Sequence, residues 1–191
     1  MGCISALKAD TPTDYVATLF SLIGVSMPNF WLGPLLIIFF SLYLGTFPVS
    51  GRDGFMSYIL PAVTLGASLA AILSRMTRTA MMEQLEAEYV KTAYSKGLSK
   101  WRVIFVHVLR NASVPIVTII GLQFGVLLTG AIITEKIFDW PGLGDLMIQA
   151  IGERDFPIIQ GLVFIFSMTY LIINLATDLL YAWIDPRIKL Q

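Results

Sequence analysis

The side chains of this sequence that could do chemistry are few and are not grouped. His107 is the single histidine and Cys3 the single cysteine. A zinc site takes three or four nitrogen, sulfur or carboxylate ligands, and one histidine without cysteine partners does not supply them. The sequence also lacks the Gly-x-x-x-x-Gly-Lys-Ser/Thr loop that cradles nucleotide phosphates. We therefore expect no catalytic residue, no metal site and no cofactor on this chain, so that any ATP it depends on is bound by another polypeptide.

Composition places the chain in a membrane. Hydrophobic residues make up 56% of the sequence and charged residues only 14%, with a mean hydropathy of +0.75. Soluble domains carry about 25% charged residues. The formal net charge is zero, so the charge gives no reason to expect nucleic acid as a partner. Membrane lipid is the partner that this composition predicts.

Four long stretches of the chain contain no charged residue. Each is long enough for one span, since a membrane-crossing helix needs about 20 apolar residues. Lipid offers the backbone no hydrogen-bond partners, and the short alternating segments of a β-barrel are absent. We therefore predict an all-α integral membrane fold, a helical bundle of about four transmembrane helices forming a single domain over 1–191. The uncharged stretches are 15–51, 54–74, 111–134 and 156–177, which contain 37, 21, 24 and 22 residues.

The first stretch exceeds one straight span. It contains Pro28 and Pro34, so we expect a kinked helix over about 15–44. We expect Asp155-Phe-Pro157 to start the last helix and Asp185-Pro-Arg187 to stop it. Residues 139–144 are expected to form a turn that opens a further short helix. The other transmembrane helices are expected from about 58 to beyond 75, over about 114–134 and over about 157–183.

Basic residues predict the orientation of the helices. Positive side chains are enriched on the cytosolic side of membrane proteins. With four spans, ten lysines and arginines fall on one side and only Arg52, Lys136 and Arg154 on the other. The asymmetry predicts that both termini and the loop between the second and third spans lie in the cytosol. The ten are Lys8, Arg75, Arg78, Lys91, Lys96, Lys100, Arg102, Arg110, Arg187 and Lys189.

That cytosolic loop, about 80–110, is the longest hydrophilic part of the chain. We predict two short amphipathic helices, 83–96 and 99–110, joined at Gly97 as a C-cap. Ser99 is the expected N-cap of the second helix. This helix would carry Trp101, Phe105, Val108 and Leu109 on one side. From the residues alone two hypotheses stay open, namely that the loop lies on the membrane surface or that it docks to a partner protein.

Some residues inside the predicted spans are polar or very small. Gln123, Gln160 and Asn174 are candidates for lining a pathway, although hydrogen bonds between helices are the simpler explanation of such residues. Gly121 and Gly125 predict a face where another helix approaches closely, either within this chain or in a dimer.

Several segments, in order along the whole chain, resemble the inner-membrane permease subunits of ABC importers. Those subunits carry a cytoplasmic Glu-Ala-Ala, three residues, Gly, nine residues, Ile-x-Leu-Pro signature. Here Ala93, Gly97 and Leu109 match it, whereas the acid, the first alanine, the isoleucine and the proline are replaced. The replacements resemble the oligopeptide, dipeptide, nickel and glutathione branch. The similar segments are Ser26-Met-Pro28, Phe30-Trp-Leu-Gly33, Leu60-Pro-Ala62, Tyr89-Val-Lys-Thr-Ala-Tyr-Ser-Lys-Gly97, His107-Val-Leu-Arg-Asn-Ala112, Glu135-Lys-Ile-Phe-Asp-Trp-Pro-Gly-Leu-Gly144, Arg154-Asp-Phe-Pro-Ile-Ile-Gln-Gly161 and Asp185-Pro-Arg187.

The resemblance implies a role for the loop. In that family it is the coupling helix, which sits in a cleft of the ATP-hydrolysing subunit and transmits its closure to the membrane helices. Exposed aromatic side chains ringed by charge are suitable anchors for such an interface. The coupling residues implied in this chain are Tyr89, Lys91, Thr92, Ala93, Lys96, Gly97 and Trp101.

The resemblance also implies partners, location and cargo. Two homologous permease subunits would enclose the pathway, with two ATP-binding subunits below and an external substrate-binding protein above, in a bacterial or archaeal cytoplasmic membrane. The cargo would be a di- or oligopeptide or a similar small solute, such as a nickel chelate or glutathione, and the chain would not be an enzyme. Family members normally have two further N-terminal helices, so we expect this chain to lack them or to be a non-functional fragment.

Two other classes of protein serve as alternatives. A membrane-embedded enzyme needs a catalytic Ser/His or Asp pair at depth, and a proton-coupled secondary transporter usually shows acidic or histidine relays within its spans. The four uncharged stretches contain neither. The sequence therefore favours the permease over both alternatives.

Overall fold

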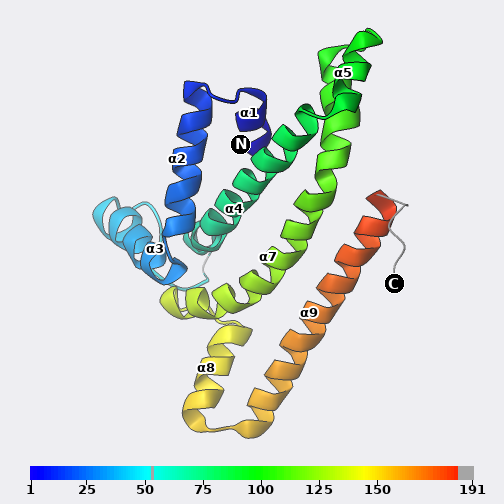
Figure 1. Ribbon diagram of the computed structural model, residues 1–191. Coiled ribbons are helices and arrows are strands. Elements are labelled where there is room, and N and C mark those ends of the chain that lie inside the picture. The colour runs from blue at the N-terminus through cyan, green and yellow to red at the C-terminus, as the bar shows by residue number, and fades with distance from the viewer. Residues whose placement is uncertain (53, 185–191) are drawn as a thin grey trace. The chain divides into compact units, whose positions relative to one another are not determined.

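The computed structural model describes the backbone of residues 1–52 and 54–184. It describes the side chains of residues 1–52, 54–128 and 130–180. Every regular element in these residues is helical, as Figure 1 shows. The predicted all-α membrane fold is confirmed. The predicted stop at Asp185-Pro-Arg187 lies outside the described residues.

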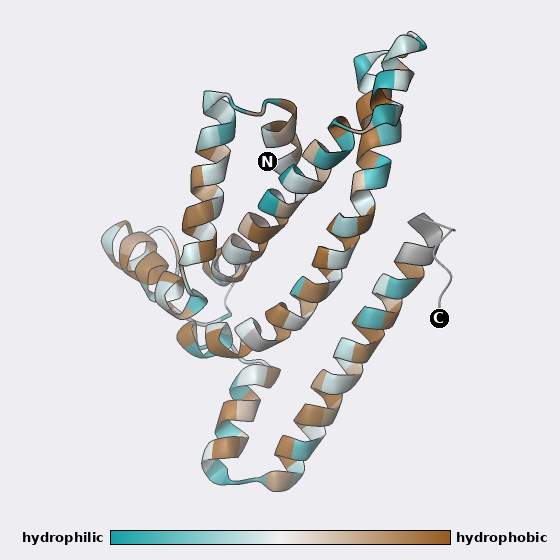
Figure 2. Ribbon diagram, viewed as in Figure 1, coloured by the Kyte–Doolittle hydropathy of each residue, from teal (hydrophilic) through white to brown (hydrophobic). Residues whose placement is uncertain are grey.

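Three helical stretches are long and apolar enough to cross a membrane on their own. They are Phe55–Leu85, Lys100–Leu128 and Phe156–Leu180, and Figure 2 shows the apolar residues along them in brown. A fourth candidate is a bent pair of helices, Pro12–Ser26 followed by Asn29–Tyr43. By length and composition the described residues therefore hold three candidate spans, or four if the bent pair is one span, in agreement with the predicted number of about four.

The bend in the first span lies at Pro28. Helix α2 (Pro12–Ser26) ends before it and α3 (Asn29–Leu36) begins after it, and the pair is bent by 104°. Pro28 adopts an extended conformation, with φ −64° and ψ 143°. Proline lacks the N–H that would continue the helix, and its ring disfavours helical geometry in the preceding residue. Pro34 lies inside α3, which continues into the π-helix η1 (Ile37–Tyr43).

The remaining long helices follow the uncharged stretches. The 3-10 turn η2 (Phe55–Tyr58) leads into α4 (Ile59–Leu85), and α7 spans Leu109–Ile137. The short helix predicted after residues 139–144 is α8 (Leu143–Glu153). The last helix, α9 (Phe156–Ile184), begins where the Asp155 carboxylate accepts a hydrogen bond of 3.1 Å from the Ile158 N–H. The predicted start of this helix is confirmed.

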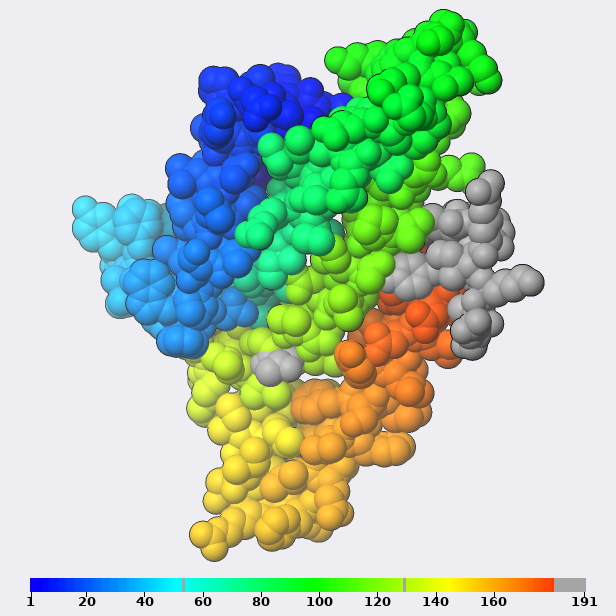
Figure 3. All heavy atoms as spheres, in the orientation of Figure 1, coloured from blue at the N-terminus to red at the C-terminus, as the bar shows by residue number. Residues whose placement is uncertain are grey.

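The chain divides into two compact units. Among the described residues, one unit contains 1–23, 71–122 and 174–184, and the other contains 24–52, 54–70 and 123–173. The first unit holds the principal cluster of buried apolar side chains, which the short N-terminal helix α1 (Gly2–Leu7), the end of α4 and the loop after it share. Figure 3 shows the atoms of that loop in green at the surface of this unit.

The glycines expected to permit close helix contacts do so within the chain. In the first unit, a side chain on Gly121 would overlap Thr177 of α9. In the second unit, a side chain on Gly125 would overlap the Tyr170 ring, 2.8 Å from its nearest atom. Small residues let helices approach in lipid, where packing replaces the hydrophobic effect. The face predicted at Gly121 and Gly125 is therefore used in contacts with α9 of the same chain.

In the second unit, one carboxylate joins α7 to α8. Glu135 Oε2 accepts hydrogen bonds from the N–H groups of Gly144 and Asp145, at 2.7 and 2.9 Å. These are unpaired donors at the start of α8, where negative charge is also favoured by the helix dipole. A side chain on Gly144 would meet the Ile132 backbone at 2.5 Å. Glu135 therefore seats α8 closely against α7.

We predict that Glu135→Ala lowers thermal stability by an amount typical of a lost N-cap, about 0.5–2 kcal/mol. Lys136→Ala is the matched control, because its ion pair with Asp145 is exposed and long at 3.3 Å and such pairs contribute about 0–1 kcal/mol. Thermal unfolding of both variants in detergent measures the difference. Equal stability of the two variants would show that Glu135 does not hold α8.

Candidate functional site

The loop between α4 and α7 is ordered around one short helix, α5 (Glu88–Ser95). Ala87, the N-cap residue of α5, has an extended conformation with φ −67° and ψ 144°, which separates α5 from α4. Glu88 lies in the first turn of α5, where a negative charge interacts favourably with the helix dipole. The helix ends at Gly97, whose φ is +77°. There the Gly97 and Leu98 N–H groups bond to the Tyr94 and Ala93 carbonyls. The predicted C-cap glycine is confirmed.

The two predicted loop helices differ from those observed. The expected helix over 83–96 is interrupted, because α4 continues to Leu85 and α5 starts at Glu88. This turn allows Val90 and Ala93 to pack on the end of α4. The expected separate helix over 99–110 is also wrong. The chain continues without a break through helix α6 (Lys100–Arg102) and the π-helix η3 (Val103–Val108) into α7. The third candidate span therefore extends out to the loop.

Ser99 occupies the N-cap position of α6, as predicted, but its side chain makes no capping hydrogen bond. The predicted apolar face of this segment is wrong. Trp101 and Phe105 are 70% and 54% exposed, whereas Val108 is fully buried. The π-helix causes this, because each of its turns takes in one extra residue and so rotates the later positions. The spacing between buried side chains along this segment is accordingly four or five residues, from Val103 and Ile104 to Val108 and from there to Ala112.

Trp101 and Phe105 form a pair on the outer side of this segment. Their rings stack with centroids 5.4 Å apart and planes 14° from parallel. Large exposed aromatic groups bring the greatest gain when a partner covers them. The pair is therefore a candidate anchor for a partner.

Buried side chains hold α5 from beneath. Val90 and Ala93 are 3% and 8% exposed, and they belong to a cluster with Met81, Val103 and Val108. Tyr89 is half-buried and its hydroxyl donates a 2.9 Å hydrogen bond to Gln84 Oε1. Of the implied coupling residues, Tyr89 and Ala93 therefore face the chain itself. The others, namely Lys91, Thr92, Lys96, Gly97 and Trp101, are exposed.

The outer surface of this segment is cationic. No acidic residue occurs between Glu88 and Glu135. Lys91 pairs with Glu88 at 2.7 Å, and both side chains are well exposed. In the part of the chain that the structure describes, Lys96, Lys100 and Arg102 form no ion pair. A partner with an acidic surface would complement this segment.

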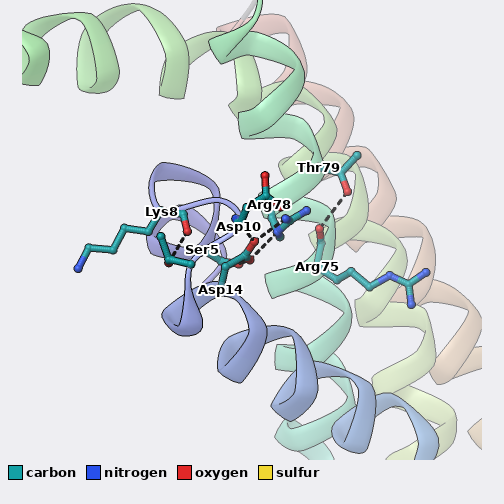
Figure 4. Close-up of polar contacts among 8 residues, drawn as sticks. Ser5, Lys8, Asp10, Asp14, Arg75, Arg78 and Thr79 are labelled. Atoms are coloured by element: carbon teal, nitrogen blue, oxygen red, sulfur yellow. Dashed lines mark hydrogen bonds and ion pairs between the residues drawn. The ribbon is translucent and has the colours of Figure 1, made fainter.

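A buried carboxylate that was not predicted from the sequence lies in the same unit (Figure 4). Asp14 is only 3% exposed. It receives two hydrogen bonds from Arg78, Nε to Oδ1 at 2.7 Å and Nη2 to Oδ2 at 2.6 Å. The Ser5 hydroxyl and the Asp10 N–H also donate to it. A signal for this pair is present in the sequence. Asp14 precedes the first uncharged stretch and Arg75 follows the second, so both are predicted at the same face of the membrane, and Arg78 lies one helical turn after Arg75.

The three candidate pathway residues differ in their exposure. The Gln123 Nε2 is shielded from solvent and has no hydrogen-bond partner among the described residues. Asn174 is half-buried and Gln160 is exposed. Their role in lining a pathway stays a prediction. Within the described ranges, no three His, Cys, Asp or Glu side chains are close enough to hold a metal ion.

Comparison with known proteins identifies the family. Residues 1–190 match the family described as binding-protein-dependent transport system inner membrane component. The chain belongs to this family. It is 45% identical over 188 residues to the glutathione transport system permease protein GsiC of Escherichia coli strain K12, covering 98% of this chain and 61% of that protein. It is 44% identical over 189 residues to the protein of the same name from Salmonella choleraesuis strain SC-B67, covering 99% and 62%.

The chain thus spans about three fifths of the length of these relatives. The family predicted from the sequence motifs is confirmed. All the segments that carried the resemblance lie within the matched residues 1–190.

We predict that Met81→Ala destabilises the protein by about 2–5 kcal/mol, because it empties space in the cluster beneath α5. Met81 is 1% exposed. Met76→Ala is the matched control on the same helix, since Met76 is 40% exposed. Thermal unfolding in detergent compares the two variants. A smaller loss for Met81→Ala than for Met76→Ala would show that this cluster does not hold the loop.

Proposed function

We propose that the chain acts as a permease subunit of an ATP-driven ABC importer, and that its α4–α7 loop docks to an ATP-hydrolysing subunit. The observation that carries this proposal is the exposed stack of Trp101 and Phe105. It lies on a cationic segment fixed to a buried core. In this arrangement the loop has both an anchor for a partner and a firm connection to the membrane helices.

The length of the third helix supports one of the two hypotheses for the loop. The uncharged part of this helix begins after Arg110, and Trp101 lies nine residues earlier on the same continuous helix. At the α-helical rise of 1.5 Å per residue, Trp101 lies at most about 13 Å beyond the start of the uncharged part, because the π-helix η3 rises less per residue. A tilt of about 40° would reduce this to at most roughly 10 Å. The headgroup layer is only about 5–8 Å thick on each side. If the membrane begins at the uncharged part of the helix, the stack would reach beyond this layer, which favours a protein partner.

The distribution of basic residues supports a cytosolic position for this surface. Ten lysines and arginines share the face of the loop and only three lie on the other face. ATP-hydrolysing subunits work in the cytosol, so this position would put the loop on the side that docking requires. Both termini are proposed to lie there too, in a bacterial or archaeal cytoplasmic membrane.

The proposed cargo is a di- or oligopeptide or a similar small solute. The support is the 45% identity to a relative that is named as a glutathione transport system permease. A homologous second permease subunit would complete the pathway, and two ATP-binding subunits and an external binding protein would complete the importer. The transport step would be alternating access, in which ATP binding favours one of two packings of the helices.

We predict that Trp101→Ala weakens the association with the ATP-binding subunits by about 30-fold, as expected for an interface residue worth about 2 kcal/mol. Phe124→Ala is the control, because Phe124 is an aromatic residue of α7 that is 43% exposed but lies within the uncharged stretch. Co-purification across a range of ATP-binding subunit concentrations measures the affinity. An affinity equal to that of the wild type would contradict docking through this stack.

We predict that Gly97→Val lowers both this association and solute uptake, whereas Gly97→Asn largely preserves them. There is open space around Gly97, so its positive φ is the only obstacle to a side chain. A β-branched residue in that conformation costs about 1–3 kcal/mol, whereas asparagine adopts it readily. The measurement is uptake and co-purification in membranes of equal permease content. Wild-type behaviour of the valine variant would contradict the proposed role of the loop.

A further inference from the structure

The hydrogen bonds to Asp14 connect three separate segments of the first unit. The carboxylate belongs to α2, Ser5 to α1 and Arg78 to α4. Arg75, one turn from Arg78, extends away from Asp14 (Figure 4), so of these two arginines it is Arg78 that makes the contact. The proposed docking of the loop does not by itself explain why these segments are joined by a buried ion pair.

Two of the three segments already form one packed body with α5. Helix α1 lies so close to α4 that a side chain on Gly2 would overlap the Ser74 carbonyl. Ala6 of α1 is buried in the same cluster as Met81 of α4 and Val90 of α5. Close-packed interiors yield little, so they transmit displacement. A displacement of α5 would therefore carry α1 and the end of α4 with it.

Helix α2 is joined to this body differently. Beside the ion pair, a cavity of about 360 Å³ remains, lined from α2 by Tyr15, Thr18 and Leu22 and from α4 by Ser74 and Thr79. Apolar contact between the two helices is therefore incomplete at this level. The ion pair bridges them at the edge of the cavity, which leaves α2 space to shift if the pair is broken.

We propose that the Asp14–Arg78 pair is a positioning clamp that passes movement of α5 to α2, the first half of the bent span. This inference rests on the proposed function of the loop. Two parallel hydrogen bonds between a guanidinium and a carboxylate fix orientation as well as distance. Because the Asp14 side chain is buried and that of Arg78 is 28% exposed, salt screens this pair less than it screens an exposed one. The clamp thus makes α2 move with the docked loop.

The first test compares transport with ATP consumption in the complete importer, reconstituted in liposomes with its other subunits. Asp14→Asn and Arg78→Gln are expected to lower the solute taken up per ATP hydrolysed by about fivefold or more, a typical size for coupling between sites. Permease content and co-purification of the ATP-binding subunits are expected to stay at wild-type levels. Lys136→Gln, which removes an exposed ion pair in the second unit, is the control and is expected to keep the wild-type ratio.

The second test measures the clamp directly. Spin labels at Val16→Cys and Ser95→Cys, in a Cys3→Ser background of the assembled permease, report the distance between α2 and α5; both sites are exposed. We expect one narrow distance distribution with and without ATP. With Asp14→Asn added, we expect the distribution to broaden without ATP and to shift with it.

The outcomes separate this inference from the proposed function. An uptake ratio equal to that of the wild type, or a distance distribution unaffected by Asp14→Asn, would overturn the clamp even if Trp101→Ala abolishes docking. Loss of co-purification in Asp14→Asn would also overturn it, because the pair would then shape the docking surface itself. If Trp101→Ala leaves docking intact, the proposed function fails, while the distances measured without ATP still show whether the pair holds α2 to α5.

Discussion

Because lipid cannot hydrogen-bond to the backbone, each long uncharged stretch of this protein must pair its N–H and C=O groups within helices. The places where helices stop are consequently few, and each has a specific cause. Pro28 divides the first span, Gly97 ends α5, and Asp155 caps the start of α9. The positions of these breaks determine where polar side chains can gather, and the loop after α4 is the largest such region that the structure describes.

Much of the fold could be predicted because membrane helices leave a strong signal in the charge pattern. The uncharged stretches located α4, α7 and α9 closely, and Gly97 was identified from its place after a helix-forming segment. The failures came from local geometry. A π-helix has no clear sequence signature. Phe105 and Val108 were therefore predicted on one face, whereas Phe105 is exposed and Val108 is buried. The 104° bend was expected only as a kink.

The candidate site was harder to predict than the fold, because it depends on contacts between distant segments. The aromatic and basic residues of the loop were visible in the sequence, but the division between those facing inward and those facing solvent was not. Tyr89 and Ala93 contact the chain itself, whereas Trp101 is exposed. The pairing of Asp14 with Arg78, 64 residues apart, requires knowing that α2 and α4 run side by side at this level.

The direction in which the aromatic pair faces also depends on the number of residues in the π-helix η3 (Val103–Val108). Such a segment is equivalent to an α-helix with one residue inserted. Removing a single residue from it would return the helix to regular periodicity. Trp101 would then rotate by about 100° about the axis of the third span, while the residues after η3 kept their own register. One codon gained or lost at this place would therefore change the direction in which Trp101 faces relative to α7, together with the side chains that η3 contributes to the cluster beneath α5.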